Sequence, residues 1–316
     1  MGENGRMRAT GVGSMPGEDY REAIKVVTGV LDDLVFVPEL PDRGAPAGMI
    51  GRTLGLVTEL AVDLQPAGWR LSSGGGVDHR RAASLMGHDL DLLEEELQEH
   101  EGTLKQQVTG PLTLAAAVAL PRGERVLADH GARRDLAGAL AAGIGEHLTA
   151  LRRRFPRHEL VVQIDEPGIS SVLRGAVPTT SGFGRYRTVH PPEADVLLRG
   201  LVQAIEDAGG RSVVHCCADD VPVALLAGTG ITAIGFDLAL AQVDDRWAET
   251  FESGVDLWPG GLDPKALEGF MRRLGYEPSS YTDRMVVTPS CGLAGQTPGE
   301  ARRSLECAQA IATSLS

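Results

Sequence analysis

The sequence predicts an α/β fold, a single (β/α)8 barrel of the TIM type with long loops after its second and fourth strands. Short apolar runs rich in β-branched residues alternate with helix-like segments along the whole chain. Most of these runs are nearly continuous, as expected for parallel strands buried on both faces. Eight strands are predicted, at residues 9–15, 34–40, 104–110, 159–166, 211–217, 231–238, 255–260 and 285–291.

Helix-like segments separate these runs, and several begin with typical helix-start residues. Asp263-Pro264 and Thr297-Pro298 place a capping side chain directly before a proline at the first helical position. Pro121 is expected to break the longest segment. The predicted helices are 18–31, 82–100, 112–152, 193–208, 219–227, 240–252, 264–275 and 298–315. Repeated strand–helix alternation favours a closed barrel.

Two connections are long, and both are candidate binding loops or lids. Residues 41–81 contain a Gly74-Gly75-Gly76 turn, and residues 168–192 are rich in Gly, Ser, Thr and Pro. No internal repeat or interdomain linker is visible, so residues 1–316 are expected to form one catalytic domain. A doubly wound open sheet is the alternative fold, but no G-x-G-x-x-G motif follows the first strand.

Composition excludes several classes of function. The chain of 316 residues has a net charge of −13 and a pI of about 5.1, which argues against non-specific binding to nucleic acid or anionic membranes. No apolar signal core begins the chain, and no run approaches the ~18 apolar residues of a membrane span. Four cysteines, two of them adjacent, do not form a disulfide framework in a chain this long. A cytoplasmic protein with reduced thiols is expected.

Three of the four cysteines lie in two short segments at predicted strand ends. His215 and Cys217 are two residues apart on an extended strand and therefore point to the same face. With Cys291 beside them they form a donor set that suits Zn²⁺. The alternative is that small cysteines fill space in the core, and the absence of C-x-x-C pairs keeps it open.

Other strand ends carry polar side chains, and each has a structural alternative. Ser14 could cap the next helix, and Glu39 could pair with Arg43 on the surface. Asp165 and its neighbour Glu166 follow a mostly apolar run at residues 160–164, where unpaired carboxylates are costly to bury.

Two further residues complete the candidate set. Asp237 ends the sixth predicted strand and could instead cap a helix. His190, in Thr-Val-His-Pro-Pro on the second long loop, is a candidate lid contact.

In their order, these motifs resemble the C-terminal catalytic domain of cobalamin-independent methionine synthases, within the superfamily that includes uroporphyrinogen decarboxylase. The resemblance extends from about residue 9 to residue 315 and rests on five motifs. They are Gly-Ser-x-Pro at 13–16, Val-Thr-Gly-Pro at 108–111, Ile-Asp-Glu-Pro at 164–167, His-x-Cys at 215–217 and Cys-Gly-Leu at 291–293.

The resemblance implies a barrel enzyme that transfers a methyl group to the thiol of homocysteine, with one zinc at the strand ends. His215, Cys217 and Cys291 match three family zinc ligands, and Asp237 stands where the family has Glu. The implied homocysteine contacts are Ser14, Glu39 and Asp165.

Two departures from the family pattern affect the methyl donor and the proton path. The family's N-terminal barrel, which helps to hold a folate donor, is absent, so a folate or a corrinoid protein could supply the methyl group. The family histidine thought to assist proton transfer is missing from the stretch around Trp258. Asp165 and His190 are therefore the candidate catalytic residues, with water as the alternative to His190.

Three other functions stay open. One is a methyltransferase with another thiol acceptor or a corrinoid-borne methyl group. Another is a zinc-free decarboxylase that would use Arg43 and Arg52 to clamp substrate carboxylates. The last is a barrel that binds zinc without turnover.

Overall fold

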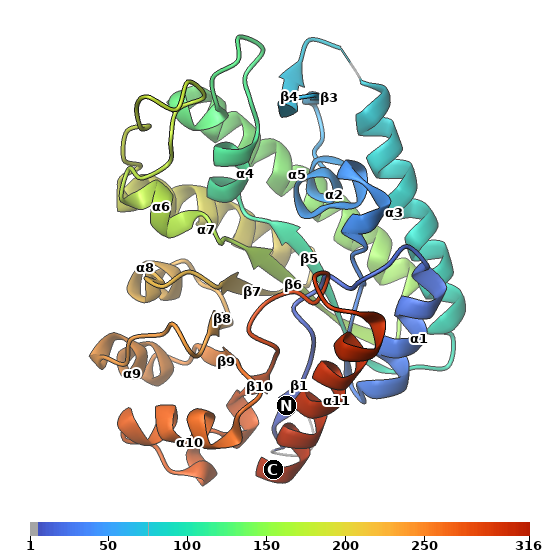
Figure 1. Ribbon diagram of the computed structural model, residues 1–316, viewed down its shortest axis with the longest axis vertical. Helices are drawn as coiled ribbons and strands as arrows, with labels where there is room; N and C mark the ends of the chain where they lie inside the picture. Colours follow the sequence, from blue (N-terminus) through green and yellow to red (C-terminus); the bar gives the residue numbers. More distant parts are fainter. Residues whose placement is uncertain (1–5, 75) are drawn as a thin grey trace.

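The computed structural model describes residues 6–74 and 76–316. They form a mixed α/β structure around a curled, half-barrel sheet of six parallel strands (Figure 1). In spatial order these strands are β2 (Leu34–Phe36), β5 (Gly102–Thr109), β6 (His158–Asp165), β7 (Arg211–Cys216), β8 (Ala233–Asp237) and β9 (Asp256–Gly260).

Two short strands, β1 (Arg8–Ala9) and β10 (Val286–Val287), form a separate parallel pair. Parallel backbone bridges continue from this pair toward both edges of the six-stranded sheet, from Ser14 to Glu39 and from Thr288 to Gly260. Each predicted strand overlaps an observed one, but the first and last are two residues long rather than seven. The glycines that follow β1 and Pro289 after β10 account for the difference, because they weaken or interrupt a hydrogen-bonded ladder.

Helices surround the outer side of the sheet, from α1 and α3 at one edge to α8, α9 and α10 at the other (Figure 1). Aspartates cap several of them, and Thr297 forms a capping box with Glu300 at the last. The helices are α1 (Tyr20–Val30), α2 (Met49–Leu54), α3 (Val77–Glu96), α4 (Pro111–Ala117), α5 (His130–Arg154), α6 (Ile169–Leu173), α7 (Pro191–Asp207), α8 (Val223–Gly228), α9 (Asp245–Glu252), α10 (Pro264–Arg273) and α11 (Pro298–Leu315).

The predicted helix over 112–152 is two helices, α4 and α5, and Pro121 lies in the turn between them. The predicted helix over 219–227 begins later, at Val223, because Pro222 occupies the position before it. Among the described residues, no helix is both long and apolar enough to span a bilayer.

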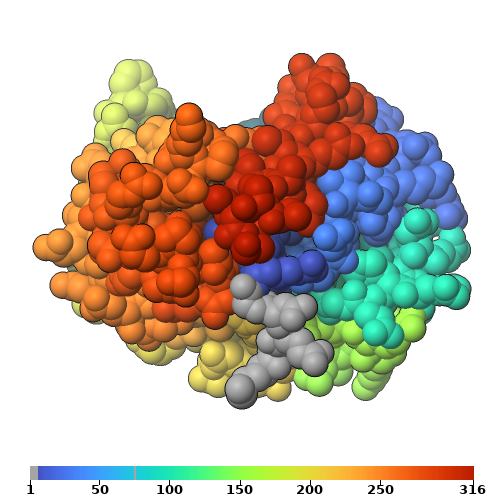
Figure 2. Space-filling model, turned by 90° about the horizontal axis from the view of Figure 1, so that it is seen from below, coloured from blue at the N-terminus to red at the C-terminus, as the bar shows by residue number. Residues whose placement is uncertain are grey.

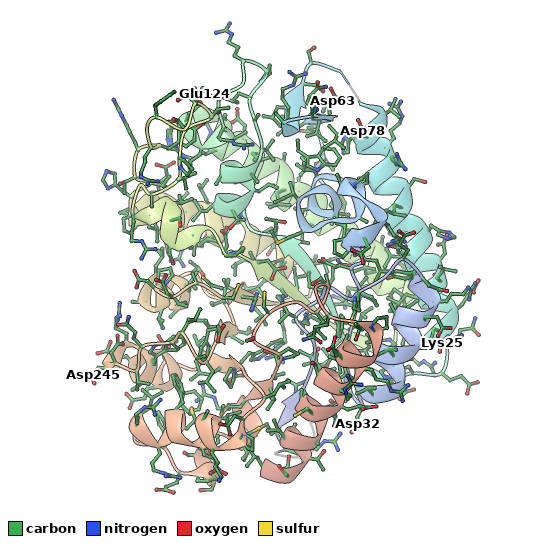
Figure 3. All side chains as sticks on the ribbon, in the orientation of Figure 1. Lys25, Asp32, Asp63, Asp78, Glu124 and Asp245 are labelled. Atoms are coloured by element: carbon green, nitrogen blue, oxygen red, sulfur yellow. The ribbon has the colours of Figure 1, made fainter. Side chains whose placement is uncertain are left out.

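The first long connection contains an antiparallel hairpin that the sequence did not predict, β3 (Ala61–Gln65) and β4 (Gly68–Ser72). The backbone of Ala119, between α4 and α5, hydrogen-bonds to Trp69 and Leu71 of this hairpin. Figure 3 places Asp63 and Asp78, beside the hairpin, at the same end of the molecule as Glu124. The first long connection and the segment between α4 and α5 therefore meet at one end of the structure.

The second long connection begins with α6 and then runs to α7 without further helix or strand. The buried Tyr186 ties it down, because its hydroxyl accepts from Arg125 N at 3.0 Å and donates to Glu124 Oε2 at 2.6 Å. This loop is thus anchored to the turn between α4 and α5.

The inner face of the strands changes character along their length. Near the amino ends the side chains form a small apolar cluster, which consists of Leu34, Val161, Val213, Ala233, Trp258 and Val286. Two residues further along β6 and β7 the inward positions are Gln163 and His215. Since successive inward positions are two residues apart, the apolar layer forms the floor below a polar layer at the carboxyl ends.

Candidate metal and substrate site

The clearest feature of the polar layer is a pair of thiols from opposite ends of the sequence. Cys217 follows β7, Cys291 follows β10, and their sulfurs lie 3.9 Å apart in a shared hydrogen bond. This bond lowers the pKa of Cys291 to about 6 and raises the pKa of Cys217, so the pair tends to hold a single proton. Two thiolates on one tetrahedral zinc lie about 3.8 Å apart at a Zn–S distance of about 2.3 Å. The spacing therefore fits that metal.

His215 is buried beside this pair, and its charged form helps to lower the pKa of Cys291. Its Nδ1 lies 3.3 Å from Asp165 Oδ1. Its Nε2 is buried without a hydrogen-bond partner anywhere in residues 6–74 and 76–316. Gly235 on the neighbouring strand makes room for the ring, because a Cβ there would lie 3.2 Å from His215 Cδ2. A ring held through one nitrogen with the other left free is typical of a metal ligand.

Asp165 ends β6 and faces the interior. Its Oδ1 accepts a hydrogen bond from Gln163 Nε2 at 2.7 Å, in addition to its approach to His215. The side chain is almost buried, yet within residues 6–74 and 76–316 no backbone amide donates a hydrogen bond to it. Asp165 can therefore orient His215 while it keeps acceptor capacity for a ligand.

Glu166, the next residue, has a different environment. Its carboxylate accepts hydrogen bonds from Leu112 N at 2.8 Å, from Thr113 N at 2.9 Å and from the Thr113 hydroxyl at 2.6 Å. Gly110 permits this approach, because a Cβ there would lie 2.3 Å from Glu166 Oε1. Burial raises the pKa of Glu166 to about 7 against the opposing effect of these bonds. Glu166 thus fastens the start of α4 to β6.

Ser14 lies against the segment that carries Cys291. Its carbonyl accepts from Leu293 N at 2.8 Å, and a Cβ at Gly292 would come within 2.0 Å of its hydroxyl oxygen. The alternative that Ser14 caps the next helix is wrong, because Asp19 caps α1. The Ser14 hydroxyl therefore lies against Gly292, the residue after Cys291.

Glu39 is bridged to Ser14 through the backbone and is also buried. The suggested surface pair with Arg43 does not form: Glu39 Oε1 lies 3.4 Å from Arg52 Nε, whereas Arg43 bonds Asp89 at 2.8 and 2.6 Å. Asp89 also bonds Arg52 at 3.2 Å, and together they form a buried network. Burial raises the pKa of Glu39 to about 7, although Arg52 and Lys105 oppose this shift.

The two remaining candidate residues are Asp237 and His190. Asp237 ends β8, where its Oδ1 accepts from Ala239 N at 2.9 Å in a local turn. His190 is exposed directly before the first residue of α7, and its side chain makes no hydrogen bond within the described chain. Across the described residues no three His, Cys, Asp or Glu side chains converge as a complete metal-binding group. The thiol pair and the free nitrogen of His215 are the donors that best fit a metal.

Of the two basic residues of the interior, sequence reasoning missed Lys105 and named Arg52 only as a substrate clamp of the alternative decarboxylase. Arg52 and Lys105 are 2% and 0% exposed, and each lies near carboxylates of the candidate site. A lysine within a strand buried on both faces, as in Leu-Lys105-Gln-Gln-Val, was the available signal.

Two projections rise from the surface of the molecule (Figure 2). One, yellow-green in Figure 2, belongs to the connection between α6 and α7, and the other, red, to the segment between β10 and α11. They rise on the same face of the molecule, and the surface dips between them (Figure 2). The red segment contains Cys291, and the yellow-green connection follows α6, which begins four residues after Asp165.

Comparison with known proteins supports the fold. No protein-family model matches the chain, and no curated protein matches it in sequence. A solved B12-independent methionine synthase from Shewanella sp. W3-18-1, in complex with selenomethionine, is 12% identical over 98% of both chains with a TM-score of 0.62. A β-1,4-D-mannanase from Cryptopygus antarcticus is 10% identical over 96% of this chain and 90% of its own, with a TM-score of 0.45.

Proposed function

We propose that this chain is a zinc-dependent methyltransferase that transfers a methyl group to the thiol of homocysteine and forms methionine. The observation that carries the proposal is the thiol pair of Cys217 and Cys291, 3.9 Å apart beside the unpartnered Nε2 of His215. The similar fold of a methionine synthase solved with selenomethionine supports it. In this proposal the eight parallel segments close as one (β/α)8 barrel over residues 1–316.

His215, Cys217 and Cys291 would hold the zinc, and Asp237 is the proposed fourth ligand. When bound, zinc supplies a positive charge that keeps the substrate thiol ionised and nucleophilic at neutral pH. The donor set suits zinc because thiolate and imidazole are its preferred ligands.

Ser14, Glu39 and Asp165 would orient the amino-acid end of homocysteine. Glu39 and Asp165 supply negative charge for the ammonium group, and the Ser14 hydroxyl can donate to the carboxylate. The substrate sulfur then forms a bond to the methyl carbon as the bond from that carbon to the donor breaks. The thiol proton passes to solvent before transfer, and His190 is the candidate that returns a proton to the donor's leaving group after it loses the methyl group.

The proposed partners are small molecules: homocysteine and a methyl donor, either a folate or a corrinoid protein. Nucleic acid and membranes are not among them. Reduced thiols are typical of the cytoplasm, and we propose that location. A decarboxylase that clamps substrate with Arg43 and Arg52 is disfavoured, because both arginines are engaged by Asp89.

The test is zinc content per chain, together with calorimetric titration of L-homocysteine in buffers of different ionisation enthalpy. We expect one zinc and the release of about one proton on binding. Cys217→Ser and Cys291→Ser should each lose the zinc. Cys307→Ser is the matched control, since Cys307 is exposed on α11. Zinc retained at full stoichiometry in both site variants would contradict the proposal.

A further inference from the structure

Lys105 is a fully buried lysine on the inner face of β5, below the thiol pair and without a role in the proposed chemistry. Its Nζ donates to Val12 O at 2.8 Å and to Gln163 Oε1 at 2.7 Å, and it lies over the Phe36 ring. Burial lowers the pKa of Lys105 to about 7, while the charges of Asp165 and Glu39 oppose this shift. Burial of an amine is costly unless hydrogen bonds compensate for it, and the two contacts of Nζ supply that compensation.

The first contact of Lys105 determines which way the Gln163 amide faces. Lys105 Nζ donates to Gln163 Oε1 whether the amine carries two or three protons, so the carbonyl oxygen of Gln163 faces Nζ. The amide nitrogen then faces the other way, where it donates to Asp165 Oδ1 at 2.7 Å and to Val12 O at 2.8 Å. Lys105 thereby makes Gln163 a donor to Asp165.

The same sequence of contacts reaches His215. The Asp165 carboxylate, which accepts from Gln163, lies 3.3 Å from His215 Nδ1. Between the two neutral tautomers of the imidazole, a carboxylate acceptor at this position favours the one with its proton on Nδ1. His215 Nε2, which has no partner in the described structure, is then the nitrogen with a free lone pair.

A second set of hydrogen bonds connects Lys105 to the segment that carries Cys291. Val12 O accepts from both Lys105 and Gln163, which fixes the backbone that leads to Ser14. The Ser14 carbonyl in turn accepts from Leu293 N, two residues after Cys291. Lys105 is therefore connected to both the histidine side and the thiol side.

We propose that Lys105 is a positioning residue that, through Gln163 and Asp165, holds His215 in the tautomer with Nε2 unprotonated and ready to bind a metal. The metal in this inference rests on the proposed function, but the tautomer can be measured in metal-free protein.

The experiment is long-range ¹H–¹⁵N NMR of the imidazole nitrogens in chelator-treated protein at pH 8, with His215 assigned from the His215→Asn spectrum. In the unsubstituted protein we expect the Nδ1–H form alone. Lys105→Met and Gln163→Met should both show a mixture of tautomers. In a parallel Co²⁺ titration, both should bind roughly 10- to 100-fold more weakly, the usual loss for an outer-shell partner of a metal ligand.

Gln106→Met is the matched control, because Gln106 is buried on the opposite face of β5 and should leave the tautomer unchanged. If Lys105→Met does not fold, Gln163→Met, which keeps the lysine, decides the outcome. Unchanged tautomer and Co²⁺ affinity in the folded variants would overturn the inference and leave the proposed function standing. A tautomer shift in a protein that binds no metal would support the inference and contradict the proposed function.

Discussion

Two adjacent carboxylates at the carboxyl end of β6, Asp165 and Glu166, have different roles. Glu166 receives three hydrogen bonds from the start of α4 and is completely buried. Asp165 faces the interior, with one amide donor and the ring of His215. The comparison shows that the partners of a buried carboxylate, rather than its burial, indicate its role: saturated acceptors fasten structure, and unsaturated ones are available to a ligand.

Among the substitutions that test this comparison, Glu166→Ala should have the largest effect. It leaves two backbone amides and the Thr113 hydroxyl without their acceptor and creates a cavity, so we expect a loss of about 3–5 kcal/mol in the free energy of unfolding. Urea unfolding measures this loss. At urea concentrations below the unfolding transition, the zinc content should equal that of the unsubstituted protein. A folded variant without zinc would contradict the purely structural role assigned to Glu166.

Asp165→Asn is the complementary change on the inner face. It removes a charge from the site but keeps the shape, so we expect homocysteine to bind roughly 30- to 150-fold more weakly, the equivalent of about 2–3 kcal/mol. The free energy of unfolding should change by less than about 1 kcal/mol. Calorimetric titration and urea unfolding give the two values, and a larger effect on stability than on binding would contradict the assignment.

Because of Glu39, ligand binding at the inner face should depend on pH. Burial raises its pKa to about 7, so the carboxyl gains its negative charge as the pH rises through 7 and loses it below. L-methionine, which has no thiol to ionise, should therefore bind more tightly at pH 8 than at pH 6, by several-fold. The Glu39→Gln variant should bind L-methionine weakly at both pH 6 and pH 8. Equal affinity of the unsubstituted protein at pH 6 and pH 8 would exclude Glu39 as the ammonium partner.

The smallest effect is expected at His190, which is exposed and makes no side-chain hydrogen bond in the described chain. His190→Ala should leave zinc content and homocysteine affinity within about twofold. Elemental analysis gives the zinc content, and calorimetric titration gives the homocysteine affinity. A larger loss of homocysteine affinity would show that the loop before α7 reaches the bound substrate.

Much of the fold could be predicted because parallel strands buried on both faces leave uninterrupted apolar runs. Hairpin β3–β4 was missed because its strands are only half-buried and lie inside a loop-like stretch. The grouping of His215 with Cys217 followed from strand periodicity, and the motif order brought in Cys291.

The ion pairs could not be predicted from local sequence. Glu39 and Arg43 are neighbours in the chain, but the turn at Pro41–Arg43 directs Arg43 to Asp89 on α3 and leaves Glu39 to Arg52. Lys105 and Gln163 are 58 residues apart. Such pairs depend on tertiary packing, which no spacing rule encodes.

X-ray absorption of the zinc edge in purified protein, before and after addition of L-homocysteine, tests the central claim most directly. We expect two sulfur ligands at about 2.3 Å, with nitrogen or oxygen ligands at about 2.0–2.1 Å, in the free protein. A third sulfur should appear with homocysteine, and not with L-methionine added at the same concentration as a control. A zinc without sulfur ligands, or no zinc at all, would contradict the claim that Cys217 and Cys291 form a metal centre that activates a thiol.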